Sequence, residues 1–535
     1  MGLKQRIVER GKQALLQPSV LRWVTDDRVM KATEGLMDAR TRVKDAWKVL
    51  LNGNELPNID PALDENIGQT EPAVTKKNGH ANGNANGHAA TNGSAATAAN
   101  GSASARAETS ERTEGSSDMA ESMKERSTLA SVGGKDVFEK AFKFMAADNA
   151  RKMGIYPYFR PLDFADGPEA QINGKRVVMF GSNNYLGLTT HPKVRDAAKA
   201  AIDKYGTSMT GSRLVNGSMR LHEEFEEKLA KWFNKESALV FTTGYQVNIA
   251  TLAALLSNKQ SVAFIDRNVH ASLYDGVRLG QSAGARLVRY RHNDAESLDK
   301  ALEKLEAEEG AFVITDGVFS AEGEIAKLDE LVPVVKKHQA RLFVDDAHAL
   351  GVIGPGGMGT AAHFGLMDQV DLIGGTFSKS MASIGGWLVG ERKVLDYIRH
   401  FAPSFMFAAA AAPPSVAAAM AAFEVMQEEP WRIDKLRENF TYMREGLRGL
   451  GFELGHTQTA VIPIYIRQDL RTIMMWRDLL EEHGIYTNPF ISPGVPPKSA
   501  MLRTSYMATH ERHHLDRALE AFEKVGKKYG VIGKK

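Results

Sequence analysis

The chain has 535 residues, of which 43% are hydrophobic and 25% are charged, and its net charge is +2. This composition is typical of a globular protein with a large core. The small net charge gives no general attraction to nucleic acid. Because cysteine is absent, disulfides, thiolate metal sites and cysteine nucleophiles are excluded.

Residues 1–52 predict a helical N-terminal extension. Seven apolar residues follow one another at steps of three or four, the spacing of a stripe along one helix: Val29, Ala32, Leu36, Ala39, Val43, Ala46 and Leu50. We expect this stripe to contact the rest of the chain, a partner protein or an anionic membrane surface. The first residues, MGLKQRIVERGKQALL, lack the apolar run of a secretory signal, so we expect a cytoplasmic protein whose extension contacts, at most, the inner membrane surface.

Residues 53–130 predict a disordered, low-complexity linker. The run NGHANGNANGHAATNGSAATAANGSASA, from Asn78 to Ala105, has too few apolar side chains to offset the entropy of ordering the chain. His80 and His88 stand in it without carboxylate or thiol neighbours, which argues against a metal site.

The remainder predicts a catalytic body with an N-terminal arm at 131–190, a large domain at 191–423 and a small α+β domain at 424–535. Amphipathic helical segments separate seven short apolar runs: VVMFGS (177–182), ALVFTTG (238–244), SVAFID (261–266), ARLVRY (285–290), AFVITDG (311–317), RLFVDDA (341–347) and VDLIGGTFSK (370–379). This alternation predicts an α/β fold with a largely parallel sheet covered on both faces.

Residues 401–423 carry no charge and are long enough to span a membrane. They are mostly alanine, however, and Pro413 and Pro414 would leave backbone groups without partners in lipid. A close-packed turn leading into a buried helix is therefore the favoured interpretation.

Chemistry in a parallel α/β sheet is expected beyond the carboxyl ends of its strands. Gly244 and Tyr245 follow one such strand and open a helix, an arrangement that can hold a phosphate. His270 follows another, where its imidazole could stack on a flat ring or cap a helix. Asp345, with Asp346 and His348, follows a third, where a buried carboxylate needs a cationic partner, and the spacing argues against a metal.

Lys379 stands alone in GGTFSKSMASIGG (374–386), after an apolar strand and before small residues. Enclosure in such a loop lowers the pKa of a lysine toward that of a neutral nucleophile. A phosphate cradle, a carboxylate for a ring nitrogen, a histidine to stack on the ring and a lysine to form an imine together match pyridoxal 5'-phosphate (PLP).

Eight motifs, from about residue 155 to 530, resemble those of the α-oxoamine synthase family of fold-type I PLP enzymes: SNNYLGL (182–188), TGSRLVNGSMRLHEEFE (210–226), FTTGYQVN, NVHASLYDGVR, RYRHND, TDGVFSAEGEIA, VDDAHALGVIGPGGMGT and GTFSKS. The last motif and residues 486–510 look most like the bacterial serine palmitoyltransferase branch. Several sibling branches usually carry glycine in place of Ser378. The resemblance implies a large domain with a mostly parallel seven-stranded sheet, and a homodimer with active sites at its interface.

The resemblance also implies the roles of the site residues. Lys379 would be the Schiff-base lysine, and Asp345 would pair with the pyridinium nitrogen. His348 would reach the ring hydroxyl, while His270 would stack on the ring and help to orient the amino acid. The phosphate would be held by Gly244, Tyr245, Thr376 and Ser378. The carboxylate of the substrate would meet the planar fork of Arg503.

The implied reaction joins L-serine to a long-chain acyl thioester of coenzyme A or acyl carrier protein, with loss of carbon dioxide, to give 3-ketosphinganine. Two alternatives remain open at this point. One is another α-oxoamine synthase that uses glycine or alanine, and the other is a non-catalytic scaffold subunit of the same fold. A scaffold would have no need of Lys379.

Two segments depart from the family pattern. Residues 408–412 are alanines where the family often has hydroxyl side chains, so any contact to a partner's phosphate is expected through the backbone or not at all. Phe490 and Ile491 stand where some members have a mobile arginine. We therefore expect carboxylate recognition to depend on Arg503 and His270.

Overall fold

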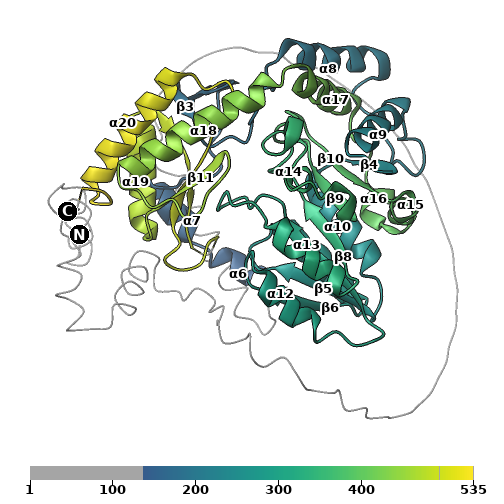
Figure 1. Cartoon of the computed structure of the whole chain (residues 1–535). Coiled ribbons are helices and arrows are strands. Elements are labelled where there is room, and N and C mark those ends of the chain that lie inside the picture. The colour runs from purple at the N-terminus through teal and green to yellow at the C-terminus, as the bar shows by residue number, and fades with distance from the viewer. Residues whose placement is uncertain (1–135, 493, 534–535) are drawn as a thin grey trace, which may run out of the picture. The chain divides into compact units, whose positions relative to one another are not determined.

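The structure, a computed structural model, describes residues 136–492 and 494–533 (Figure 1). The predicted extension at 1–52 and the linker at 53–130 lie outside the described residues. Residues 136–154 belong to one compact unit and contain the short helices α6 (Glu139–Phe142) and α7 (Ala146–Lys152). The second unit begins, among the described residues, at Ile155 and contains every other element.

A seven-stranded sheet forms the centre of this second unit. Its order is β4 (Ser237–Phe241), β10 (Gly386–Gly390), β9 (Leu372–Thr376), β8 (Arg341–Asp345), β7 (Gly310–Asp316), β5 (Ser261–Asp266) and β6 (Arg286–Tyr290). Strand β10 runs antiparallel to both of its neighbours, and all other neighbouring pairs are parallel. The predicted mostly parallel, seven-stranded sheet is therefore confirmed.

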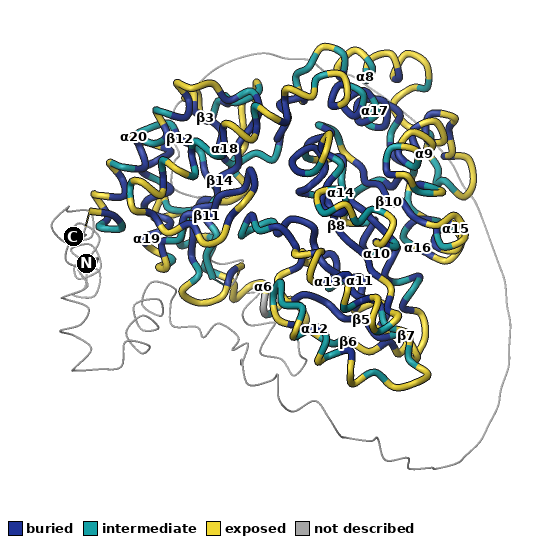
Figure 2. The backbone as a smooth tube through the Cα atoms, in the orientation of Figure 1, coloured by how far each residue is buried: buried dark blue, intermediate teal, exposed yellow. Residues whose placement is uncertain are grey.

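Helices cover both faces of this sheet (Figure 1). One face packs against α10 (Gly244–Leu255) and α11 (Ala271–Ser282), and the other against α12 (Ala295–Leu302) and α13 (Leu328–Lys337). Figure 2 shows buried backbone along the strands and exposed backbone on the outer turns of the helices. The continuous apolar runs of the sequence are explained by this burial on both faces.

One predicted strand lies elsewhere. The run at 177–182 starts within β3 (Lys175–Met179), which belongs to a four-stranded sheet with β1 (Phe164–Asp166), β2 (Glu169–Ile172) and β12 (Ile485–Tyr486). The seventh strand of the large sheet is instead β10, whose sequence GWLVG is short and flanked by glycines.

The C-terminal part contains a three-stranded antiparallel sheet in the order β11 (Val461–Tyr465), β14 (Met501–Ser505) and β13 (Asn488–Phe490). The helices of this part are α18 (Trp431–Gly449), α19 (Asp469–Glu481) and α20 (Arg512–Lys528). The remaining helices are α8 (Pro192–Tyr205), α9 (Arg220–Trp232), η2 (Pro355–Gly357), α14 (Thr360–His363), η3 (Met367–Gln369), α15 (Arg392–Phe401), α16 (Pro403–Met406) and α17 (Pro413–Glu428). The runs at 461–466 and 501–507 lie side by side as β11 and β14.

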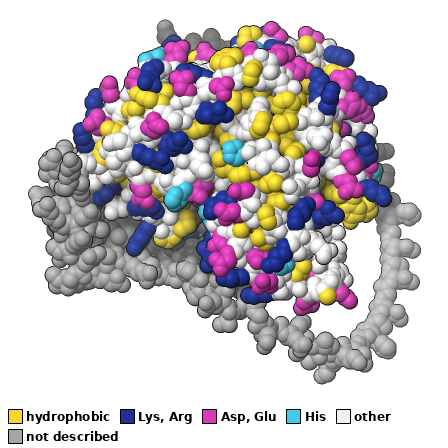
Figure 3. All heavy atoms as spheres, viewed as in Figure 1, with side chains coloured by type: hydrophobic (Ala, Val, Ile, Leu, Met, Phe, Trp, Pro, Cys, Tyr) yellow, Lys and Arg dark blue, Asp and Glu magenta, His cyan; other side chains and the backbone are white. Residues whose placement is uncertain are grey.

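The uncharged segment at 401–423 contains α16 and the first part of α17. Ten residues of α17 are buried, and Pro413 occupies its first turn, as the favoured interpretation predicts. Within the described ranges, no helix is both long and apolar enough to cross a membrane. On the face drawn in Figure 3, basic and acidic side chains alternate and do not gather into a patch of one sign.

Trp387 provides a test of the central packing. It is fully buried on β10 and stacks on Phe233 at a centroid distance of 4.5 Å. We expect Trp387→Ala to lower the free energy of unfolding by about 3–5 kcal/mol because a large cavity replaces the ring. Urea titration followed by far-ultraviolet circular dichroism measures the change. Trp431→Ala, at a side chain that is 52% exposed, is the control and should change stability by less than about 0.5 kcal/mol.

Candidate active site

Polar residues gather where the parallel strands of the large sheet end. Strands β5, β7 and β8 end on Asp266, Asp316 and Asp345, and β9 ends on Thr376. Parallel strands present their carboxyl ends at one edge, so these side chains share a region of the molecule. The sequence-predicted residues after β4, β5, β8 and β9 are all brought to this edge.

Lys379 follows β9 and is half-buried. No described residue forms an ion pair or hydrogen bond with its amine. Burial lowers the pKa of Lys379 to about 8, opposed by the charges of Asp345 and Asp316 and reinforced by that of Arg503. The charges of both carboxylates and of the guanidinium thus act on the amine, and about half of it is neutral at mildly basic pH.

Asp345 is buried and held by two donors. Asn248 Nδ2 donates to its Oδ2 at 2.6 Å, and the backbone N–H of Ala347 donates to its Oδ1 at 3.0 Å. Asp316 lies beside it in register, and burial together with the Asp345 charge raises the pKa of Asp316 well above its ordinary value. Asp316 also accepts the backbone N–H of His270 at 3.1 Å.

His348 is buried and shares a hydrogen bond of 2.7 Å between its Nδ1 and Tyr185 Oη. Burial lowers the pKa of His348 well below its ordinary value, and the charges of Lys379 and Arg503 act in the same direction. The imidazole is therefore neutral at physiological pH. Its link to Tyr185 fixes the orientation of the ring.

His270 serves as the N-cap of α11, where its Nδ1 accepts the backbone N–H of Ser272 at 3.3 Å. The sequence left open whether this imidazole caps a helix or stacks on a ring. The capping role is confirmed, and His270 remains exposed enough to meet a ligand. Its ring also lies edge-on to that of Tyr245 at a centroid distance of 6.1 Å.

The first turn of α10 adjoins the end of β9. Thr243 caps the helix by accepting the backbone N–H of Gln246 at 3.1 Å. A Cβ atom on Gly244 would lie 2.5 Å from Thr376 Cβ, so only glycine fits there. Thr376 Oγ1 lies 2.8 Å from Ser378 Oγ. Helix amides and two hydroxyls therefore meet, as expected for a phosphate cradle. Tyr245 is 43% exposed, and its hydroxyl donates to Asp275.

Arg503 lies on β14 and is buried. Its Nε donates to the carbonyl of Ser320 at 2.7 Å, and Nη1 donates to Ser505 Oγ at 2.8 Å. Both Nη atoms donate to Asn183 Oδ1 at 3.1 Å. A guanidinium has five N–H groups, so these contacts leave one N–H of Nη2 for a further acceptor.

Four side chains of the site were not identified from sequence: Asn183, Tyr185, Asn248 and Asp316. Asn183 and Tyr185 are in the motif SNNYLGL, far in sequence from their partners Arg503 and His348. Asn248 offered a detectable signal, because it lies one helical turn after Gly244 and so on the same helix face. Asp316 offered a signal as well, because it stands at the end of the apolar run at 311–317, and it ends a strand next to that of Asp345.

The alanine segment is held to its own chain by backbone atoms. Thr242 Oγ1 donates to the carbonyl of Ala409 at 2.7 Å, and the N–H of Ala410 donates to the carbonyl of Gly211 at 2.9 Å. Asp346 is directed away from Asp345 and accepts the N–H of Thr360 at 2.9 Å. In the part of the chain that the structure describes, no three His, Asp or Glu residues converge to hold a metal ion.

Residues 175–522 match the family model of aminotransferase class I and II. A serine palmitoyltransferase of Sphingobacterium spiritivorum is 42% identical over 389 residues, which cover 73% of this chain and 96% of the relative. An 8-amino-7-oxononanoate synthase of Thermoanaerobacter pseudethanolicus is 38% identical over 386 residues, or 72% of this chain and 96% of the relative. The chain belongs to the α-oxoamine synthase family.

Solved structures agree with this membership of the α-oxoamine synthase family. A serine palmitoyltransferase of Sphingomonas wittichii superposes with a TM-score of 0.71 at 35% identity, covering 74% of this chain and all of the other. A structure of SPT with its PLP internal aldimine gives the same TM-score at 34% identity, with the same coverage.

The residues of this α-oxoamine synthase fit PLP. The cradle at Gly244 has no room for a side chain, and Lys379, the only basic group in the loop after β9, has a depressed pKa. Asp345, a carboxylate with two hydrogen-bond donors, acts on that base through its charge. Asn248 Oδ1 is buried without a hydrogen-bond partner, so a polar acceptor remains beside Asp345. Each feature corresponds to a chemical group of the cofactor.

The depressed pKa of Lys379 can be tested directly. In the cofactor-free protein, we expect acetylation of Lys379 by acetic anhydride to reach half of its maximal rate near pH 8, because the neutral amine is the nucleophile and an ordinary lysine titrates near about 10.4. Peptide mass spectrometry after labelling at successive pH values measures the rate, with the exposed Lys393 as the internal control. Parallel pH profiles for the two lysines would contradict the prediction.

Proposed function

We propose that this chain is a PLP-dependent serine C-palmitoyltransferase, which condenses L-serine with a long-chain acyl thioester to give 3-ketosphinganine. One observation carries the proposal: the amine of Lys379, which has no ion pair with any described residue, lies within the electrostatic influence of both Asp345 and Arg503. A base with a carboxylate suited to the cofactor and a cation suited to an amino acid in its surroundings supports this activity. The relatives named serine palmitoyltransferase, at 40–42% identity, support serine as the amino acid.

Residues from several parts of the chain would hold the cofactor. Gly244, Thr376 and Ser378 would hold the phosphate, with Tyr245 beside them, and Lys379 would provide the covalent attachment. Asp345, fixed by Asn248, would pair with the ring nitrogen, and His348 would donate to the ring hydroxyl. When bound, PLP withdraws electrons from the Cα of an attached amino acid.

The remaining residues act on the amino acid. Arg503 would bind the carboxylate of the amino acid through the N–H of Nη2 that has no other acceptor among the described residues. His270 would also contact the amino acid and help to orient it. Lys379 would remove the Cα proton at Nζ, for which a pKa of about 8 is suitable. Cα then forms a bond to the acyl carbon as the carbon–sulfur bond of the thioester breaks and the thiol leaves. The serine carboxylate leaves as carbon dioxide, and Cα regains a proton.

The choice of amino acid and acyl group can be tested on the purified holoenzyme. We expect 3-ketosphinganine from L-serine and palmitoyl coenzyme A, detected by mass spectrometry, and no product from glycine or L-alanine. Palmitoyl acyl carrier protein is the second donor. Product from L-alanine or glycine alone would overturn the serine assignment and favour another α-oxoamine synthase activity.

The role of Lys379 is tested in the same assay. Lys379→Ala should lower turnover by at least about a hundredfold, the lower end of what a general base contributes. Lys393→Ala, which removes an exposed lysine outside the site, is the matched control and should keep full activity. Full activity in both variants would show that Lys379 is not the catalytic base.

We also propose that the enzyme is a homodimer whose interface adjoins the active site. Leu214, Val215 and Phe407 are 48%, 71% and 72% exposed. Their segments are joined, because the N–H of Ala410 donates to the carbonyl of Gly211, and Ser212 bridges to Ala409. Exposed apolar side chains gathered in this way are typical of an interface. Thr242, which precedes the α10 cap, binds the same segment.

The proposed interface can be tested by sedimentation velocity. We expect wild-type protein to sediment as a dimer and the double variant Val215→Asp Phe407→Asp as a monomer, because two charges would be buried without partners. Leu470→Asp, at a side chain that is 40% exposed on α19, is the control and should leave the dimer intact. A double variant that remains dimeric would place the interface elsewhere.

A further inference from the structure

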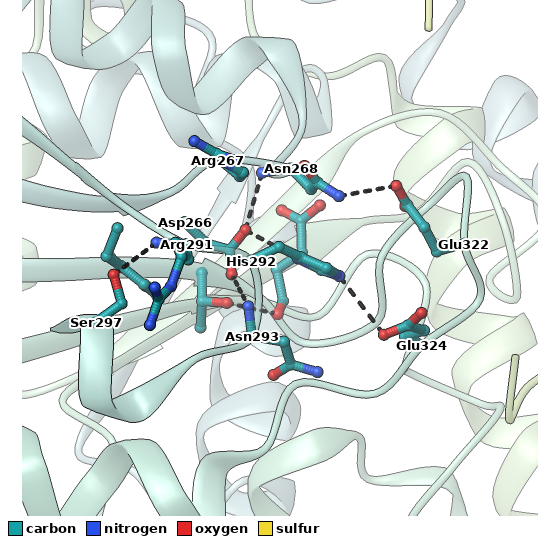
Figure 4. A network of polar contacts seen from close by, with 12 residues as sticks. Asp266, Arg267, Asn268, Arg291, His292, Asn293, Ser297, Glu322 and Glu324 are labelled. Carbon is teal, nitrogen blue, oxygen red and sulfur yellow. Dashed lines mark hydrogen bonds and ion pairs between the residues drawn. The ribbon is translucent and has the colours of Figure 1, made fainter. Parts of the chain in front are cut away.

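A polar network lies at the carboxyl ends of β5 and β6, the last two strands in the order of the large sheet (Figure 4). It includes none of the residues assigned above to the cofactor. Its centre is Asp266, the fully buried last residue of β5. His292 Nδ1 lies 3.0 Å from Asp266 Oδ1, and the N–H of Asn293 donates to Oδ2 at 2.6 Å. The N–H of Asn268 donates to Oδ1 at 2.8 Å. Asp266 thus fixes the segment that follows β6.

His292 connects this segment to residues 317–326, named here the 317–326 turn. Its Nε2 forms an ion pair with Glu324 Oε2 at 3.6 Å, and its ring lies edge-on to Phe319 at a centroid distance of 4.3 Å. Figure 4 shows the imidazole between Asp266 and Glu324. Burial opposes a charge on His292, but these two carboxylates outweigh it and raise its pKa to about 10. The imidazole is therefore a cation at physiological pH.

Neighbouring residues hold the same turn. Asn293 Nδ2 donates to the carbonyl of Ile325 at 3.0 Å, and Asn293 Oδ1 accepts the N–H of Lys327 at 2.8 Å. Asn268 Nδ2 donates to Glu322 Oε1 at 3.0 Å. The turn is thus held from the sheet side at Glu322, Glu324 and Ile325.

On its other side, the 317–326 turn contacts Arg503. The carbonyl of Ser320 accepts Nε of Arg503 at 2.7 Å. The carbonyl of Gly323 accepts the N–H of Gln458 and the hydroxyl of Thr459, both at 3.0 Å, just before β11. Strand β11 pairs with β14, which carries Arg503. The turn therefore fixes the guanidinium both directly and through the strand beside it.

We propose that His292 is a positioning residue that, through the ion pair with Glu324 and the carbonyl of Ser320, aims Arg503 at the carboxylate of the amino acid substrate. This inference rests on the proposed function, in which Arg503 binds that carboxylate. His292 itself touches neither substrate nor cofactor. Its effect is confined to the part of the substrate that Arg503 holds.

Two ligands separate this role from general stabilisation. Ethanolamine is serine without the carboxylate, so a variant with a misaimed Arg503 should bind L-serine more weakly and ethanolamine as before. Each is titrated into the holoenzyme, and the dissociation constant is measured from the change in the absorption of the bound cofactor. We expect His292→Gln to weaken L-serine binding about tenfold, the effect of losing one charge-assisted contact, and to leave ethanolamine within about twofold.

Three further variants complete the experiment. Glu324→Gln removes the same ion pair from the turn side and should have the same effect as His292→Gln. Adding His292→Gln to Arg503→Lys should cause no further loss, because both changes act through one guanidinium. His338→Gln is the matched control: Nε2 of His338, at the C-cap of α13, lies 2.6 Å from Oδ1 of Asp299 on α12, and His338 is similarly buried.

The outcomes separate the inference from the function on which it rests. Equal weakening of both ligands in His292→Gln, or unchanged binding of both, would overturn the positioning role while wild-type protein still prefers L-serine. Wild-type protein that binds L-serine no better than ethanolamine would overturn the proposed function itself. Selective loss of L-serine binding in His292→Gln and Glu324→Gln, absent from His338→Gln, supports the inference.

Discussion

Lys379 holds an amine partly out of water, no described residue forms an ion pair with it to stabilise its charge, and the surrounding site depends on this constraint. Enclosing a cation without a partner is unfavourable, so its pKa falls to about 8 and a neutral base is created. Strand β9, which leads to Lys379, packs closely against large rings. A Cβ on Gly375 would lie 2.9 Å from the ring of Trp387, and one on Gly374 would lie 3.1 Å from that of Phe343. The two glycines therefore let these rings pack against opposite faces of the strand.

Sequence reasoning found the groups that lie at the ends of parallel strands. Lys379, Asp345 and Gly244 each follow a continuous apolar run, and the geometry of a parallel sheet brings such positions to one edge without further information. Strand β10 was missed for a related reason: it is antiparallel, short and bounded by glycines, so its sequence lacks the signals of a crossover unit. The number of seven strands came from the resemblance to the family, and the run at 177–182, counted with the runs of the parallel sheet, belongs to another sheet.

Contacts between distant segments were beyond such reasoning. The pairing of Arg503 with Asn183 spans 320 residues, and that of His348 with Tyr185 spans 163. Neither periodicity nor turn chemistry identifies a partner at that separation. Resemblance to a family supplied the role of Arg503, but the contacts that orient its guanidinium became visible only in the structure.

The contacts that connect His292, after β6, to Arg503 are polar for a physical reason. An apolar contact would stabilise the 317–326 turn but allow it to slide, because hydrophobic contact has no preferred direction. The hydrogen bond between His292 Nδ1 and Asp266 is directional, and loss of the ion pair with Glu324 would leave an enclosed charge without its second partner. Gly323, at φ +67° and with no space for a Cβ beside the carbonyl of Val461, fixes the opposite side of the turn. The hydrogen-bonded imidazole with its ion pair to Glu324 and the close approach at Gly323 together define where the Ser320 carbonyl lies, and hence where Arg503 points.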